Sequence, residues 1–293
     1  MSSRINRRCF IKNSTAVVGA VSLGVTEITW ASPQDTCRWA LLSDTHISGD
    51  RTKTARGFSM TNNLDAVVSS VIDSRPCGIV IDGDIAFSTG EVEDYRIARE
   101  YVDKLSLAAP VYMALGNHDN LENFNSVFPE TPGAKAPVKG KHITIINAGS
   151  IRLILLDSLQ ITNYTPGLLG YAQRQWLDHY LKRSEPKPTL IFLHHDFGEE
   201  DSKLQDDLRF FRIVQPRREV KAVFYGHSHR YHFSKQGDLD LVNLPSTAYH
   251  FTSWQSVGWV SAEITSEGAS FEYCAVGGGM ADDGKVTCLK WRR

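Results

Sequence analysis

The stretch that decides the fold is residues 38–46, RWALLSDTH, in which an apolar run ends in Asp44-Thr45-His46. Residues 39–42 are typical of a buried strand, and the polar segment follows where such a strand would end. Four further apolar runs end in the same way, before Gly83-Asp84, Gly116-Asn117-His118-Asp119, His194 and Gly226-His227-Ser228-His229. One such segment occurs by chance in many proteins. Five in succession, holding half of the ten histidines, indicate one shared site.

Helices alternate with the strands in the first part of the chain. The apolar residues of segment 62–75 recur at helical spacing and predict an amphipathic helix. Acidic residues at 91, 93 and 94 mark the start of a second helix, whose apolar stripe runs from Tyr95 to Leu105. With strands at 38–43, 78–82 and 111–115, the order is β-α-β-α-β, which implies parallel strands with right-handed crossovers.

The rest of the chain continues the same architecture. Residues 120–141 contain three prolines and predict a loop over the mouth of the site. Segments 142–147 and 151–157 alternate and flank Ala148-Gly149-Ser150, which predicts a hairpin. We expect a helix at 171–181, strands at 190–194 and 220–225, and antiparallel strands from there to Cys288. The sequence shows no internal repeat or low-complexity tract, so we expect one α/β domain over residues 32–293.

The first 31 residues have the pattern of an export signal. Residues 6–12, NRRCFIK, resemble the twin-arginine motif, and the apolar stretch 16–25 is too short to span a bilayer. Thr29-Trp30-Ala31 offers a cleavage site. A disordered basic N-terminus is the alternative. The export interpretation predicts a periplasmic or secreted protein with no transmembrane segment in its mature chain.

Composition excludes some partners. The formal net charge is −1, so no basic excess indicates nucleic-acid binding. The five segments supply oxygen and imidazole donors without a thiolate, which suits Mn, Fe or Zn rather than a structural zinc site.

Together the segments resemble the calcineurin-like metallophosphoesterases over residues 38–250. The Asp-x-His opening looks most like the bacterial class III cyclic-nucleotide phosphodiesterase branch. One departure is His194-His195-Asp196-Phe197, where that branch has His-His-Pro-Pro. Purple acid phosphatases match less well, because Phe87 stands where they have tyrosine and His46 where they have glycine. The resemblance implies a β-sandwich of two mixed sheets flanked by helices, with the site at the C-terminal ends of strands.

The resemblance also implies two divalent or trivalent metal ions, Mn, Fe or Zn, and a ligand set. The first metal takes Asp44, His46, Asp84 and His229. The second takes Asp84, Asn117, His194 and His227. A carboxylate such as Asp84 can bridge two cations about 3.5–4 Å apart, and a hydroxide between them is the expected nucleophile.

Three residues near these ligands have other expected roles. The resemblance places the His118 ring beside the metals, where it stabilises developing charge and protonates the leaving oxygen. Asp119 is expected to orient or charge His118. His195 adjoins His194 and is the alternative ligand at that position.

The function expected is an exported, metal-dependent hydrolase of phosphate-ester small molecules, with diesters preferred to monoesters. A broad phosphomonoesterase or nucleotidase that scavenges phosphate is the alternative. A non-catalytic scaffold of the same fold is a third reading, but such a scaffold would lack a ligand and none is missing. The sequence leaves the substrate, the metal pair and the oligomeric state open.

The cysteines that remain after signal removal are Cys37, Cys77, Cys274 and Cys288, an even number suited to an oxidising compartment. Cys37 and Cys77 each precede a carboxylate, Asp44 or Asp84, by the same distance. Neighbouring parallel strands that deliver both carboxylates to one metal would bring these cysteines level, within disulfide reach. We therefore predict Cys37–Cys77, which leaves Cys274–Cys288 as a candidate for closing a hairpin. Four buried thiols are the alternative.

Overall fold

A computed structural model describes residues 37–198, 200, 202–252 and 254–293, and the predicted export signal lies outside this part of the chain. Its main elements are two mixed sheets. The first contains β1 (Cys37–Leu42), β4 (Gly78–Asp82), β5 (Val111–Ala114), β13 (Ser256–Ile264), β14 (Gly268–Gly278) and β15 (Val286–Lys290). Their order in the sheet is β15-β14-β13-β1-β4-β5. β1, β4 and β5 are parallel, whereas β13 runs antiparallel to β1.

The second sheet has the order β11-β12-β10-β9-β8-β7-β6. Its strands are β6 (Ala134–Lys135), β7 (Thr144–Ala148), β8 (Ile151–Leu155), β9 (Thr189–Phe192), β10 (Val220–Tyr225), β11 (His232–Gln236) and β12 (Leu239–Asn243). β8, β9, β10 and β12 are mutually parallel. A small separate hairpin joins β2 (Thr54–Ala55) to β3 (Phe58–Ser59).

Side chains of β1 alternate between two cores, because successive residues of a strand point to opposite faces. Trp39 and Leu41 pack between the two sheets, together with Phe192, Phe224 and Phe271. Ala40 and Leu42 belong to the core on the other face of the first sheet. The two sheets therefore form a sandwich that is buried on both sides, as expected for strands with continuous apolar runs.

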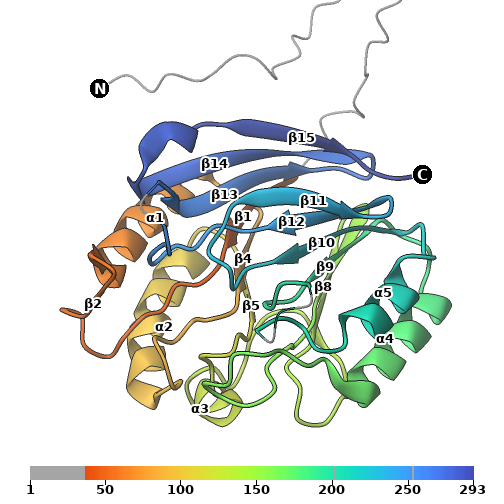
Figure 1. The fold of residues 1–293 in the computed structure, drawn as a ribbon, viewed down its shortest axis with the longest axis horizontal. Helices are drawn as coiled ribbons and strands as arrows, with labels where there is room; N and C mark the ends of the chain where they lie inside the picture. Colours follow the sequence, from red (N-terminus) through yellow and green to blue (C-terminus); the bar gives the residue numbers. More distant parts are fainter. Residues whose placement is uncertain (1–36, 199, 201, 253) are drawn as a thin grey trace, which may run out of the picture.

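Helices cover the outer faces of the sandwich. α1 (Met60–Ser74) and α2 (Val92–Ser106) pack on the first sheet, and α4 (Gly170–Arg183) and α5 (Asp207–Val214) pack on the second. Figure 1 shows these two helix pairs on opposite sides of the sheets. Among the described residues, none of the helices has the length and apolar character needed to span a membrane.

The predicted α/β sandwich of two mixed sheets is confirmed, with two local differences. Residues 120–141 are not only loop, since they contain α3 (Leu121–Val127) and β6. The Asn120 side chain caps α3 by accepting from the Asn123 amide at 3.0 Å, a local signal that the three prolines obscured. The short helix α5 was also missed. Its buried residues Phe210, Phe211 and Val214 lie on one helical face, but the helix has only eight residues and no side-chain cap that would mark its start.

The Cys37–Cys77 disulfide is confirmed, with a Cα–Cα distance of 6.0 Å. The two strands pair one residue away from the predicted register, because Trp39 is level with Gly78 and the Cys77 amide donates to the Arg38 carbonyl. A parallel neighbour one position away is still within reach of a disulfide. The predicted Cys274–Cys288 closure is wrong, because Cys288 is level with Ser270 on β14.

Candidate metal centre

The five polar segments converge at one end of the sandwich. Asp44 and His46 follow β1, Asp84 follows β4, and Asn117 follows β5. From the second sheet, His194 follows β9, and His227 and His229 follow β10. The strands β1, β4, β5, β9 and β10 all present their C-terminal ends here, where α/β folds carry their sites.

Backbone conformation is unusual at these residues. Five of them have positive φ, which is rare for residues other than glycine: Asp44 (52°), His46 (43°), Asp84 (47°), His227 (65°) and His229 (54°). Each left-handed residue turns the chain sharply at the strand end. Such strain persists where the surrounding structure enforces it, and it concentrates at functional sites.

The neighbouring glycines are required by close packing. At Gly83, φ is +81° and a Cβ would lie 2.6 Å from Nδ1 of His194. At Gly116, a Cβ would collide with the Asp84 carboxylate. The glycines of these motifs thus let adjacent loops approach closely enough for their polar side chains to meet.

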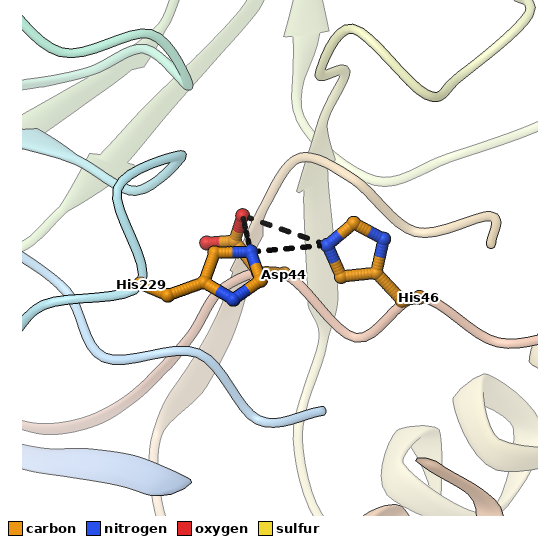
Figure 2. A group of neighbouring side chains, drawn as sticks. All are labelled: Asp44, His46 and His229. Carbon is orange, nitrogen blue, oxygen red and sulfur yellow. Dashed lines mark hydrogen bonds and ion pairs between the residues drawn. The ribbon is translucent and has the colours of Figure 1, made fainter. Parts of the chain in front are cut away.

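Asp44, His46 and His229 form the first group, in which one ligand atom from each lies within 4.8 Å of the others. Nε2 of His229 lies 3.2 Å from Oδ1 of Asp44 and 3.2 Å from Nε2 of His46. Figure 2 shows the two imidazoles and the carboxylate pointing toward one another. All three side chains are buried.

Asp84, His194 and His227 form the second group, within the same 4.8 Å limit. Oδ2 of Asp84 lies 3.2 Å from Nε2 of His194 and 3.7 Å from Nε2 of His46. One carboxylate oxygen therefore reaches an imidazole of each group. Asp84 occupies the position that a bridging ligand needs.

Ring orientation is fixed by backbone carbonyls. Three imidazoles place Nδ1 against a carbonyl oxygen: His46 on Phe87 (3.2 Å), His194 on Asp82 (2.8 Å) and His229 on Tyr249 (2.6 Å). With Nδ1–H donating, Nε2 keeps its lone pair for the centre of the site, the usual arrangement of a metal-binding histidine. His227 is reversed, because its Nε2 lies 3.1 Å from the Ser202 carbonyl and Nδ1 is left to face inward.

The charges in this cluster suit a cation. Burial by itself raises carboxyl pKa values, but the imidazoles of His229 and His194 outweigh it and hold the pKa of Asp44 below its ordinary value. His194 likewise holds the pKa of Asp84 low. Burial lowers the pKa of His46 and of His227 to about 4, which favours neutral rings with free lone pairs.

At His194 the balance is reversed. Burial lowers its pKa, but the carboxylates of Asp84 and Asp44 raise it well above the ordinary value. Two buried carboxylates therefore attract positive charge at this point.

Several buried polar atoms of the cluster lack a hydrogen-bond partner. Oδ1 of Asp44, Oδ1 of Asn117 and Nε2 of His194 are buried and have no hydrogen-bond partner among the described residues. Asp44 and His194 are instead within ion-pair distance of His229 and Asp84, each at 3.2 Å. Buried polar atoms normally have hydrogen-bond partners, so buried donors and acceptors without one at Asp44 and His194 fit a site that a cation completes. Oxygen and imidazole donors without thiolate fit a pair of first-row transition metal ions.

The geometry separates His194 from His195. Nε2 of His194 lies among the carboxylates, whereas Nδ1 of His195 pairs with Oγ of Ser158 at 2.7 Å. The His195 ring instead packs beside His227, with ring centroids 4.9 Å apart. Asp196, which replaces the first proline of the related motif, is tied to Lys203 at 2.5 Å.

His118 lies at the edge of both groups. Its backbone amide donates to Oδ1 of Asp84 at 2.8 Å, and its Nδ1 lies 2.7 Å from the Ser88 carbonyl. Its remaining nitrogen, Nε2, is the one free to act in the site, where His118 groups with His46 and Asp84.

Asp119 does not make the contact expected of it. Its carboxylate accepts hydrogen bonds from the amides of Gly116 (2.8 Å), Ala86 (3.1 Å) and Ile85 (3.2 Å), and from the Tyr95 hydroxyl (3.0 Å). It therefore ties the loop after β5 to the loop after β4 rather than charging the His118 ring. The sequence could not show this, because backbone amides carry no signature of residue type.

Two aromatic residues beside the site, Tyr249 and Phe251, were not predicted. Tyr249 stacks on His46 with ring centroids 4.9 Å apart, and Phe251 stacks on His229 at 4.4 Å. Neither residue belongs to a polar motif. The only available signal was their alternation in a segment after the last histidine motif.

Comparisons with known proteins agree with this geometry. The profile of the calcineurin-like phosphoesterase family matches residues 38–231, more than half of the chain. The chain is 27% identical over 233 residues to a 3′,5′-cyclic-nucleotide phosphodiesterase of Nostoc sp., covering 77% of this chain and 84% of the relative. It is 26% identical to the glycerophosphodiester phosphodiesterase GpdQ of Enterobacter lignolyticus, over 72% of this chain and 77% of the relative.

Solved structures share the fold at low identity. A dimetal phosphatase from Danio rerio superposes with a TM-score of 0.66 at 14% identity, covering 88% of this chain and 100% of that chain. A purple acid phosphatase from yellow lupin gives 0.60 at 13% identity, covering 87% of this chain and 54% of that chain. With the family profile and the assembled donor groups, these findings establish that the chain belongs to the calcineurin-like phosphoesterases and is a metal-dependent phosphoric ester hydrolase.

Proposed function

We propose that this protein is an exported phosphodiesterase with a dinuclear metal centre. The observation that carries the proposal is the position of Asp84, whose Oδ2 lies 3.2 Å from His194 and 3.7 Å from His46. These imidazoles belong to two different donor groups, so a single carboxylate can serve both.

The proposed ligand sets contain the two donor groups, and the family resemblance adds Asp84 to the first and Asn117 to the second. In this proposal the first metal is held by Asp44, His46, Asp84 and His229. The second is held by Asp84, Asn117, His194 and His227. His194 rather than His195 is the ligand, because only His194 directs a nitrogen at the carboxylates. When bound, the two ions neutralise phosphate oxygens and lower the pKa of the attacking water.

His118 supplies the proton in this proposal. Its Nδ1 donates to the Ser88 carbonyl, which fixes the ring and leaves Nε2 directed toward the donor groups. A proton on Nε2 can pass to the leaving oxygen as the ester bond breaks. Asp119 acts on geometry, because it holds the backbone turns that carry Asp84 and His118.

Preference for diesters rests on the relatives. The two similar proteins named above are a cyclic-nucleotide and a glycerophosphodiester phosphodiesterase. We take from them the class of bond and not the particular substrate.

The test compares bis(p-nitrophenyl) phosphate with p-nitrophenyl phosphate, each with added Mn²⁺, Fe²⁺ or Zn²⁺. The proposal expects a higher kcat/KM for the diester, and loss of turnover with a chelator. A higher kcat/KM for the monoester would instead support a phosphomonoesterase. Lack of turnover of either compound under every metal would support a non-catalytic scaffold.

Export is the second part of the proposal. The Cys37–Cys77 disulfide supports it, because disulfides form and persist in oxidising compartments. Changing both Arg7 and Arg8 to lysine should retain an active protein in the cytoplasm, whereas the unchanged chain reaches the periplasm or medium. Undiminished export of the double variant would rule out the twin-arginine route.

A further inference from the structure

Near the candidate metal ligands lies an arginine, Arg56, that pairs with no carboxylate in the part of the chain that the structure describes. Arg56 is exposed, and its guanidinium carbon lies 4.6 Å from the ring centre of Phe251. Phe251 in turn stacks on His229 at 4.4 Å. His229 belongs to the first donor group, in which its Nε2 lies 3.2 Å from Asp44. Phe251 therefore contacts both the guanidinium of Arg56 and a residue of this group.

The guanidinium of Arg56 has no anionic partner among the described residues. No carboxylate among the described residues lies within ion-pair distance of it, whereas nearby Arg51 pairs with Glu100 at 2.6 Å. The cation of Arg56 does act on its surroundings. Burial raises the pKa of Tyr249, and Arg56 opposes that rise.

The backbone holds Arg56 in a strained position. It has φ of 52° and is followed by Gly57 at 85°, in the two-residue turn between β2 and β3. Two successive positive φ values define a type I′ hairpin turn, in which asparagine, aspartate and glycine are the favoured residues. Arginine is not one of these residues, and a positive φ is uncommon for a residue other than glycine.

The turn is fixed relative to the site. Phe58, two residues after Arg56, meets the ring of His250 edge-on at 4.8 Å. In the sequence, His250 lies between Tyr249 and Phe251, the two aromatic residues that stack on site histidines. The same segment carries a second cation, since Lys53 lies 5.1 Å from the ring centre of Phe87, whose carbonyl orients His46.

We propose that Arg56 binds a second phosphate group on the substrate, outside the ester that is hydrolysed. This inference rests on the proposed phosphodiesterase function and narrows its substrate class to phosphodiesters that carry an additional phosphate. The guanidinium has a planar fork of donors that matches phosphate oxygens, and stacking on Phe251 limits the entropy lost when it binds. A substrate whose only anion is the scissile diester would leave this charge unmatched.

The test uses two substrates with the same leaving group. They are thymidine 5′-(p-nitrophenyl phosphate) and the same compound with an added 3′-phosphate. Both release p-nitrophenolate, so a difference in kcat/KM reports recognition of the second phosphate. We expect the metal-loaded enzyme to prefer the 3′-phosphorylated compound by roughly 10–100-fold, the range for hydrogen bonds to a charged group.

The variant Arg56→Gly separates recognition from folding, because glycine adopts positive φ without strain. The preference should fall about 10-fold or more, mainly through KM, while the Tm does not decrease. Arg51→Ala, which removes an exposed arginine already paired with Glu100, should keep the wild-type preference.

The outcomes are distinguishable. Turnover of both compounds without a preference, or a preference that survives in Arg56→Gly, would overturn this inference alone. No turnover of either compound by the metal-loaded enzyme would overturn the proposed function and this inference with it.

Discussion

The two sheets contribute different chemistry to the metal centre. In the proposed ligand sets, the first sheet supplies the oxygen donors Asp44, Asp84 and Asn117, with His46 as the one imidazole assigned to a metal. The second supplies imidazoles alone: His194, His227 and His229. Neither sheet by itself assembles a complete set for either metal.

The loops of each sheet are held by backbone hydrogen bonds. In the first sheet, the Asp44 amide donates to the Gly83 carbonyl at 3.1 Å and the His46 amide donates to the Asp84 carbonyl at 2.9 Å. In the second, the Gly226 amide donates to the His194 carbonyl at 3.0 Å. Across the sheets, the site is joined through imidazoles: His229 faces the Asp44 carboxylate at 3.2 Å, and His194 meets the Asp82 carbonyl at 2.8 Å. Metal binding should therefore link the two halves of the sandwich.

The largest expected effect comes from Asp84, which lies close to imidazoles from both sheets. Asp84→Ala should remove both metals, because each loses a ligand and the remaining imidazoles lose their shared anion. Turnover should fall to background. Elemental analysis of the purified variant checks this, with Asp73→Ala, an exposed carboxylate on α1, as the control. Two metals per chain in the Asp84 variant would refute the bridging assignment.

The next largest effect concerns a histidine that touches the centre without being assigned to a metal. His118→Ala should retain both metals and lower kcat on poor leaving groups by roughly 10²–10⁴-fold, the range of a positioned general acid. The loss should shrink with p-nitrophenyl esters, whose leaving group needs little protonation. An equal loss on both kinds of ester would assign His118 to charge stabilisation alone, and loss of a metal would make it a ligand.

The disulfide joins residues of the first sheet only. Its removal therefore distinguishes the stability of that sheet from metal binding between the two sheets. Cys77→Ser should lower the free energy of unfolding by roughly 3–4 kcal/mol, because the bridge closes a loop of 40 residues. Urea unfolding measures this, and Cys274→Ala is the control without the bridge. Metal content at neutral pH should stay at wild-type values. A variant that is as stable as the wild type would show that strand pairing alone aligns β1 and β4.

The smallest expected effect is on the pH dependence of stability and concerns His142, a buried histidine outside the site. Burial, aided by Lys135, lowers the pKa of His142 to about 4. A depressed histidine pKa stabilises the fold fully above the unfolded value near 6.5, and this contribution is lost as the pH falls toward 4. From pH 7 to pH 5 the loss should be about 2 kcal/mol.

The variant His142→Asn isolates this contribution, because asparagine keeps an amide donor but does not titrate. Its free energy of unfolding should fall less than that of the wild type between pH 7 and pH 5. His179→Asn, on an exposed part of α4, serves as the control. Identical pH profiles for the wild type and His142→Asn would assign the acid sensitivity to the site histidines.

Much of the fold could be predicted from local pattern. Strands Gly78–Asp82 and Val220–Tyr225 have the predicted bounds, because long apolar runs between turn residues are unambiguous. α3 and α5 were not predicted, since short helices depend on a single cap or on packing against neighbours. The Cys37–Cys77 pair was predicted from a register that proved one residue out, which the reach of a disulfide tolerates.

For the site, the sequence by itself determined the donor residues and their order, because carboxylates and imidazoles after strand ends are visible in a linear chain. Only the tertiary structure decided which groups meet. In the structure, His194 faces the carboxylates and His195 contacts Ser158. The Asp119 carboxylate accepts hydrogen bonds from backbone amides. Arg56 and Phe251 lie at the edge of the site. These choices depend on left-handed backbone turns and on the packing of two sheets, and side-chain spacing along the chain encodes neither.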